Sequence, residues 1–142
     1  MRTIALRFGE NIAPQEGTIP IHQNMIKENG YVWYGKFGSP VSEKVSSAIL
    51  ENDNPRILLI QSGKNKRYWA YVDSIQWEKP IDGLYPSNYE QAMDRFKTWF
   101  KVVKIEEAPL DIMSQCRVAS SGALLTHASR SSMSPYFIID TE

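Results

Sequence analysis

A short segment bounded by two glycines, residues 30–38 (GYVWYGKFG), concentrates side chains that could recognise a flat ligand. Trp33 and Tyr34 run directly into Gly35, where the missing side chain lets a backbone or a planar group approach closely. Flat rings beside bare backbone suit the binding of an uncharged heterocycle such as a nucleobase, through stacking and hydrogen bonds to its edge. An aromatic corner that closes a small β-barrel explains the same residues, so both interpretations stay open.

Aromatic and basic residues alternate along the rest of the chain. Four tryptophans and seven tyrosines are many for 142 residues. The aromatic clusters are interleaved with the basic residues Lys36, Lys64, Lys66, Arg67, Arg95, Lys97 and Lys101. Stacking contributes about 1–3 kcal/mol per base, and basic side chains can hold the flanking phosphates. Core packing is the simpler role for a tryptophan, and we expect it for at least two of them, Trp69 and Trp99 by preference.

The segment 126–133 (THASRSSM) combines hydroxyl side chains with one arginine, directly before the last predicted strand. Hydroxyls and a guanidinium on a loop can clamp a phosphate. Arg130 is therefore a candidate phosphate contact, while a plain surface charge beside serines explains it equally well.

Catalytic and metal-binding patterns are missing from the sequence. It has no histidine pair at helical ligand spacing, no phosphate-cradling glycine motif and no serine elbow. Cys116 is the one cysteine, so neither a disulfide framework nor a multi-cysteine metal site can form. As a nucleophile it would need His22 or His127, which are both distant in sequence, and a small buried hydrophobe is the better interpretation. We expect no catalytic residue, no metal and no cofactor.

Length and charge limit the class of protein further. A chain of 142 residues with 42% hydrophobic and 23% charged residues is typical of one folded domain, which we expect to span residues 1–142. Its formal net charge is +0, which argues against non-specific coating of nucleic acid but leaves room for a local basic groove. The sequence contains no apolar run near the ~20 residues of a membrane span and no signal-peptide pattern, so we expect a cytoplasmic protein.

Hydrophobic periodicity predicts the elements that position these residues. The predicted strands are residues 2–8, 31–37, 56–62, 67–77, 97–106 and 135–140, and the predicted helical segments are 22–29, 39–52, 89–96 and part of 120–134. Strand 56–62 is too apolar on both sides to be an edge, and it forms a hairpin with strand 67–77. Ser39 is the expected cap of helix 39–52. Together these elements predict an α+β domain built on a small, strongly bent sheet or pseudo-barrel flanked by two or three helices.

Strict alternation assigns side chains to the two faces of the long strands. On strand 67–77 it places Trp69, Tyr71 and Ile75 on one side and Ala70 and Val72 on the other. On strand 97–106 it separates Phe100 and Val102 from Trp99, Val103 and Ile105.

The order of these pieces resembles the PUA-like superfamily, and within it the EVE and YTH-type domains. The resemblance covers most of residues 30–139 and rests on VWYG at 32–35, a helix, NPRILLI at 54–60, YWAYV at 68–72, FKTWFKVVKI at 96–105, APL at 108–110 and the Ser129-Arg130 loop. Residues 1–29 lie outside it.

The resemblance implies a domain that binds nucleic acid and holds a flipped or single-stranded, modified base in an aromatic pocket. It implies Trp33 as one wall of the cage and Trp77 or Tyr85 as the second, with backbone groups of Tyr34 and Gly35 reading the base edge. The phosphate contacts it implies, together with the basic residues above, are Arg130, Lys36 and Arg67.

The loop 78–88 departs from the resemblance, because it lacks the two closely spaced tryptophans of eukaryotic YTH domains. Methylated DNA is therefore as suitable a ligand as modified RNA. The resemblance also implies that a separate nuclease or other effector chain acts with this domain.

Two alternatives from other classes remain open. A small nucleotide- or RNA-processing enzyme of the same superfamily predicts a carboxylate or histidine in the aromatic pocket, for example Asp73 or His127, with a perturbed pKa. A protein-interaction module predicts a large exposed apolar patch and no continuous basic groove.

Overall fold

The computed structural model describes residues 1–10, 13, 15–132, 134 and 136–141. Within them, seven strands form one mixed sheet in the order β2-β5-β4-β3-β1-β7-β6. The strands are β1 (Arg2–Phe8), β2 (Val32–Phe37), β3 (Arg56–Gln61), β4 (Arg67–Gln76), β5 (Phe96–Glu107), β6 (Cys116–Val118) and β7 (Tyr136–Thr141). The helices are α1 (Thr18–Asn29), α2 (Glu43–Leu50) and α3 (Leu125–Ser131), with the 3₁₀ helices η1 (Ser87–Arg95) and η2 (Ile112–Gln115).

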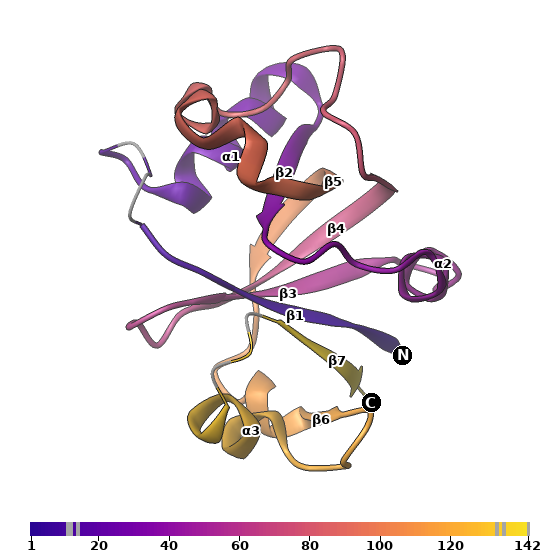
Figure 1. Cartoon of the computed structure of the whole chain (residues 1–142). Coiled ribbons are helices and arrows are strands. Elements are labelled where there is room, and N and C mark those ends of the chain that lie inside the picture. The colour runs from indigo at the N-terminus through magenta and orange to yellow at the C-terminus, as the bar shows by residue number, and fades with distance from the viewer. Residues whose placement is uncertain (11–12, 14, 133, 135, 142) are drawn as a thin grey trace.

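The sheet is strongly bent, and its helices do not form one layer, since α2 lies beside the central strands while α1 and α3 lie toward the two ends (Figure 1). β1 pairs with β3 in parallel, and the other neighbouring strands pair antiparallel. α1 and η1 lie at one end with β2, while α3 and β6 lie at the other end (Figure 1). The predicted α+β fold with a bent sheet is confirmed.

Most predicted elements occur within a few residues of their expected bounds. β1 has the expected bounds, and β3 lies between β4 and β1, as its two apolar faces required. β7 begins at Tyr136, and Pro135, the first residue of the predicted closing strand, lies outside the described residues.

The expected cap of the second helix was wrong. α2 begins at Glu43, and the Ser42 side chain caps it by accepting a hydrogen bond from the backbone N–H of Val45 at 3.2 Å. The Ser39 carbonyl instead accepts a hydrogen bond from Lys36 Nζ at 2.6 Å. The cap therefore lies three residues after the position that the sequence predicted for it, at Ser42 instead of Ser39.

The expected faces of β4 and β5 were wrong beyond their midpoints. The pairing of these strands shifts between Tyr71 and Val72 and again between Val72 and Ser74. Each shift is a β-bulge, which turns the following side chains to the other face. Ile75 and Ile105 therefore join the core group that contains Val72. The alternation rule assumes an unbroken ladder, and the bulges break it.

The buried side chains form three groups. The first lies beneath α1 and α2 and is built on β1, β3 and the middle of β5. The second lies between the sheet and the η2–α3 region and includes Cys116, whose pKa burial raises to about 11, so the thiol is a buried hydrophobe as predicted. The third, called here the aromatic group, consists of Trp33, Tyr85, Tyr89, Phe96 and Trp99. In the described part of the chain, every helix is too short or too polar to cross a bilayer.

Candidate functional site

A pocket of about 150 Å³ opens between β1 and β2. Residues 6–9 at the end of β1 form one wall, residues 34–37 of β2 form the facing wall, and Asn88, Tyr89 and Phe96 complete it with Ala13 and Thr18. β1 and β2 are not hydrogen-bonded neighbours in the sheet. The bend of the sheet brings the two strands near each other, and the place where they do not pair leaves a hollow, as the mouth of a small barrel does.

The outer edge of β2 is held by the segment that carries η1. The backbone N–H of Trp33 donates to the Leu84 carbonyl at 2.8 Å, and the N–H of Gly38 donates to the Arg95 carbonyl at 3.2 Å. Between them, the N–H of Gly35 donates to the Tyr89 hydroxyl at 3.3 Å. This arrangement satisfies the edge strand and places the Tyr89 ring in the pocket wall.

Gly35 is required by the protein's own packing. A Cβ atom on this residue would lie 2.5 Å from Cδ1 of Phe96, far inside van der Waals contact. The Phe96 ring packs against Phe37 with a centroid distance of 4.5 Å and stacks on Tyr89 at 4.3 Å. The planar group expected to approach Gly35 is therefore the Phe96 ring, and these three rings give the pocket its apolar side.

A buried hydrogen-bond chain fixes the orientation of Tyr89. His22 is 1% exposed, and its Nδ1 lies 2.7 Å from the Thr18 carbonyl, so Nδ1–H donates. Its Nε2 lies 2.8 Å from the Tyr89 hydroxyl and accepts from it. Burial lowers the pKa of His22 to about 4, which keeps the ring neutral, and burial raises the pKa of Tyr89, which keeps its hydroxyl protonated.

Two cationic residues, Arg7 and Lys36, also line the pocket. Lys36 is only 6% exposed, and its Nζ donates to the carbonyls of Phe37 at 3.0 Å and Ser39 at 2.6 Å. Burial lowers the pKa of Lys36. The Arg7 guanidinium donates to the Ser129 carbonyl. Among the described carboxylates, none forms an ion pair with Arg7 or Lys36, so the pocket lining combines aromatic rings with two cationic residues.

Of the residues predicted to form the site, three line the pocket: Tyr34, Gly35 and Lys36. Trp33 is 6% exposed and belongs to the aromatic group, and its Nε1–H donates to the Asp82 carboxylate at 3.2 Å. Side chains alternate along β2, so Trp33 and Tyr34 point to opposite faces, and of these two residues only Tyr34 lines the pocket. Trp33 therefore does not form an open cage wall.

The two candidates for the second wall of the cage, Trp77 and Tyr85, also lie outside the pocket. Trp77 donates from Nε1 to the Val41 carbonyl at 2.7 Å and packs near the start of α2. The Tyr85 ring belongs to the aromatic group, and its hydroxyl donates to the Glu90 carboxylate at 3.0 Å. Neither residue lines the pocket.

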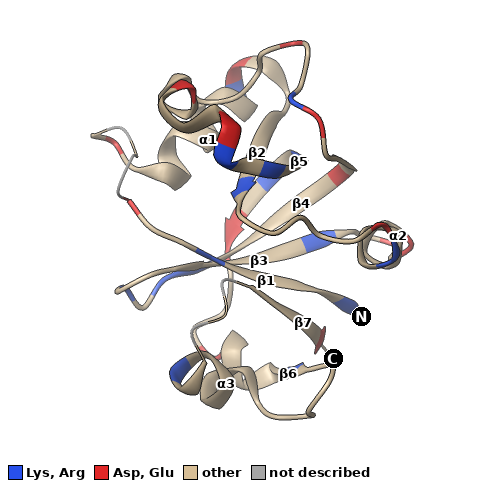
Figure 2. Ribbon diagram, in the orientation of Figure 1, with Lys and Arg blue, Asp and Glu red and all other residues tan. Residues whose placement is uncertain are grey.

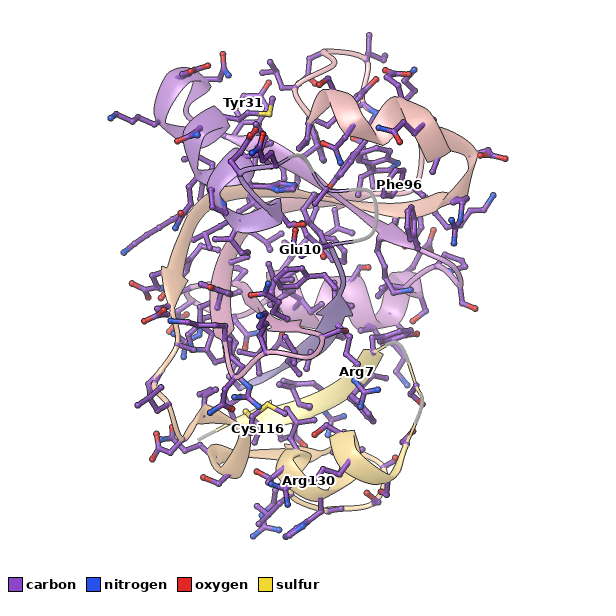
Figure 3. All side chains as sticks on the ribbon, turned by 90° about the vertical axis from the view of Figure 1, so that its left-hand side faces the viewer. Arg7, Glu10, Tyr31, Phe96, Cys116 and Arg130 are labelled. Atoms are coloured by element: carbon purple, nitrogen blue, oxygen red, sulfur yellow. The ribbon has the colours of Figure 1, made fainter. Side chains whose placement is uncertain are left out.

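The other predicted phosphate contacts lie outside the pocket too. Arg67 is the first residue of β4, next to the turn of the β3–β4 hairpin, and it donates to the Asn65 side chain. Arg130 is exposed on α3, at the end of the molecule opposite Phe96 (Figure 3). Positive and negative side chains are scattered over the whole ribbon, which agrees with the net charge of +0 (Figure 2).

The residues that would support an enzyme or a protein-interaction module lie away from the pocket or apart from one another. Asp73 and His127 are exposed, and neither lines the pocket. The large apolar side chains that are exposed in the described residues lie on four separate segments: Leu50, Ile81, Val103 and Leu110. Among the described residues, neither a carboxylate nor a histidine lines the pocket, and the exposed large apolar side chains do not share one segment.

Sequence reasoning missed the contribution of the first 29 residues. Arg7 lies in the pocket wall and His22 lies behind it, although both fell outside the resemblance. An arginine in an otherwise apolar strand end, and a histidine one turn after Thr18, were the available signals. Phe96 and Tyr89 were noted only as aromatic residues in clusters, because nothing local tells which ring of a cluster faces a hollow.

The comparisons with known proteins agree with this architecture. The chain belongs to the Pua-like family, whose model matches residues 4–136. Domains of this family typically bind RNA or other nucleic acids and are generally binding modules rather than enzymes. No curated protein and no solved structure matches the chain.

Proposed function

We propose that this chain is a reader domain of the EVE/YTH type that holds one flipped or single-stranded, methylated base of a nucleic acid in the pocket between β1 and β2. The observation that carries the proposal is the composition of that pocket, whose lining combines aromatic rings with the cationic residues Arg7 and Lys36. Its volume of about 150 Å³ suits one flat ring, since a dry cavity of about 150 Å³ accommodates benzene.

The residues act as follows in this proposal. Phe37, Phe96 and Tyr89 form the apolar wall that the base contacts, in a group whose rings already pack at centroid distances of 4.5 and 4.3 Å. Tyr34 and the backbone of Gly35 contact the base edge, as expected from the sequence. Lys36 contacts a phosphate or an acceptor on the base. Trp33 and Tyr85, which pack in the aromatic group with Phe96, support the walls from behind, whereas Trp77 lies outside the site.

Arg67 and Arg130 are proposed phosphate contacts only for a nucleic acid that extends well beyond the pocket. Such a ligand would have to follow the surface toward the β3–β4 hairpin or toward α3, which carry these residues. We propose that a separate nuclease or other effector chain acts with this domain. The ligand is modified DNA or RNA, which the domain binds in the cytoplasm.

The energies involved are modest. Extruding a base from a duplex costs a few kcal/mol, and renewed stacking returns about 1–3 kcal/mol per base. Hydrogen bonds to charged donors such as Lys36 add about 1.5–3 kcal/mol. A buried methyl group adds about 0.8 kcal/mol, which corresponds to about fourfold discrimination. Larger selectivity requires that the unmethylated base leaves part of the pocket unfilled.

The test is a fluorescence-anisotropy titration with labelled single-stranded oligonucleotides at 50 mM salt. Matched DNA and RNA strands would carry one central adenine, N6-methyladenine, cytosine or 5-methylcytosine. We expect one methylated strand to bind tightest. Phe37→Leu, which removes a pocket ring, should weaken binding about tenfold. Trp77→Phe, which changes a ring outside the pocket, should leave binding unchanged. If no strand binds at this salt, the proposed function is wrong.

A further inference from the structure

Three of the described residues that line the pocket carry a hydroxyl group: Thr18, Tyr34 and Tyr89. Two of these hydroxyls are bonded inside the protein. The Thr18 hydroxyl donates to the Glu10 carboxylate at 3.1 Å. The Tyr89 hydroxyl donates to His22 and accepts from the N–H of Gly35. Both hydroxyl protons are therefore already used by the fold.

The hydroxyl of Tyr34 has no such partner. Tyr34 is only 6% exposed, yet none of the described residues forms a hydrogen bond with its hydroxyl. The hydroxyl is also absent from the fully enclosed polar atoms that lack a partner in the described part of the chain, which are Ser46 Oγ, Arg67 Nε and Thr141 Oγ1. It therefore reaches accessible space, and the space that Tyr34 lines is the pocket.

The ring of Tyr34 is held by packing, so the hydroxyl keeps its position. The ring belongs to the core group beneath α1, and its centroid lies 5.3 Å from that of the His22 ring. Burial raises the pKa of Tyr34, and the Glu10 carboxylate raises it further, so the hydroxyl stays protonated and remains a donor. Glu10 is itself occupied by Thr18, whose backbone N–H donates to it at 3.0 Å. The pocket therefore contains a fixed donor that the fold itself does not use.

A buried hydroxyl without a partner is unfavourable, because it has lost its hydrogen bonds to water. Phenylalanine at position 34 would fill the same part of the core without this cost. Binding sites often retain polar groups that lower the stability of the protein, since the ligand needs them. The unused hydroxyl of Tyr34 in the pocket wall therefore indicates a ligand atom that accepts its hydrogen bond.

We infer that the Tyr34 hydroxyl selects the bound base by donating a hydrogen bond to an acceptor on the base edge, which is an unprotonated ring nitrogen or a carbonyl oxygen. This inference rests on the proposed function, in which the pocket takes the recognised base. It adds a restriction on the ligand, namely that the methyl group lies on a different atom from the acceptor. A base methylated on the acceptor itself is rejected, because the hydroxyl then stays without a partner in the complex.

The first experiment tests whether the fold uses the hydroxyl, and it needs no ligand. The melting temperature of Tyr34→Phe should lie within about 2 °C of the wild type or above it, since no internal hydrogen bond is lost. Tyr89→Phe is the contrasting variant, because it loses the bonds to His22 and Gly35. Its melting temperature should fall by at least about 4 °C. If Tyr34→Phe is destabilised as strongly as Tyr89→Phe, or does not fold, the inference is overturned.

The second experiment pairs the hydroxyl with single atoms of the ligand. The strand that binds tightest in the anisotropy titration is remade with one acceptor of its central base removed at a time, a ring nitrogen being replaced by C–H or a carbonyl oxygen by sulfur. One of these altered strands should bind the wild type about tenfold more weakly than the parent strand does. Tyr34→Phe should also bind the parent strand about tenfold more weakly, and it should bind the parent and that altered strand within about twofold of each other.

Tyr68→Phe is the matched control for the loss of one phenol oxygen. Tyr68 is partly buried against the same core group as Tyr34, and it does not line the pocket. Its variant should bind every strand as the wild type does. If Tyr68→Phe and Tyr34→Phe weaken binding equally, the effect arises in the core and the inference is overturned.

Failure of the inference and failure of the proposed function give different results. If strands bind but no altered acceptor weakens binding to the wild type, the hydroxyl does not read the base, and the inference is overturned while the proposed function stands. The same holds if every altered strand loses affinity by equal factors for the wild type and Tyr34→Phe. If no strand binds the wild type, the proposed function is wrong and the inference falls with it, whatever the melting temperatures are.

Discussion

Replacing Gly35 by alanine tests the claim that the Phe96 ring, packed against bare backbone, shapes the pocket. The added Cβ atom would lie 2.5 Å from Cδ1 and 3.0 Å from Cε1 of Phe96, about 1 Å closer than ordinary contact at 3.4–4 Å. Gly35 does not have a positive φ, so alanine can adopt its backbone conformation and the effect is purely steric.

The size of the effect follows from how little the Phe96 ring can move. Phe96 is 7% exposed and lies against Phe37 at 4.5 Å and Tyr89 at 4.3 Å. Overpacking of this kind typically destabilises a protein by about 1–3 kcal/mol. For a chain of this length that corresponds to a fall in melting temperature of about 4–12 °C. Because the displaced ring must move within the pocket wall, ligand affinity should fall about tenfold as well.

The assay is a double-mutant cycle measured by urea unfolding. Gly35→Ala, Phe96→Leu and the double variant are compared with the wild type. The smaller leucine side chain makes room for the Cβ atom, so the double variant should be more stable than the sum of the two single effects by about 1 kcal/mol or more. If Gly35→Ala stays within about 0.5 kcal/mol of the wild type, or if the two changes are additive, the packing argument for Gly35 is refuted.

Three further predictions concern the groups around the pocket and the core. The pKa of His22 is about 4 in the folded protein and 6.5 when the chain is unfolded, so the unfolded chain binds the extra proton between these values. The stability contributed by neutral His22 is complete above pH 6.5 and falls by on the order of 3 kcal/mol as the pH drops to 4. Urea unfolding at stepped pH should show this fall in the free energy of unfolding, and His22→Gln should remove it. Lys36→Met deletes a buried charge bonded only to carbonyls, so its unfolding free energy should stay within about 1 kcal/mol of wild type while oligonucleotide affinity falls about tenfold; a large loss of stability with unchanged affinity would contradict the assigned role. Burial raises the pKa of Cys116 to about 11, so the thiol should react with a disulfide reagent only at the rate at which the protein unfolds; rapid labelling of the native protein would show that the thiol is accessible.

The local elements were predictable because they depend on neighbours in the chain. The alternation of apolar and polar residues set the bounds of β1, and the two apolar faces of β3 required a central position in the sheet. The predicted strand within segment 30–38 is β2, and three of its predicted site residues, Tyr34, Gly35 and Lys36, line the pocket. The order of motifs along the chain was enough to indicate the PUA-like family.

The site itself depended on contacts between distant parts of the chain. Arg7 and Lys36 come from strands that are not paired, and only the bend of the sheet brings them to one pocket. The bulges between β4 and β5 turned Ile75 and Ile105 inward, against the local rule.

What the sequence determined by itself is therefore the set of strands and helices and the presence of many rings. What only the tertiary structure decided is which rings face a hollow. Trp33 was the most conspicuous residue of the chain, yet strand alternation turns it toward Asp82 and the aromatic group, while Phe96 takes the space beside Gly35. A side chain's direction on a strand is fixed relative to its neighbours, but which face becomes a pocket is fixed by the curvature and pairing of the whole sheet.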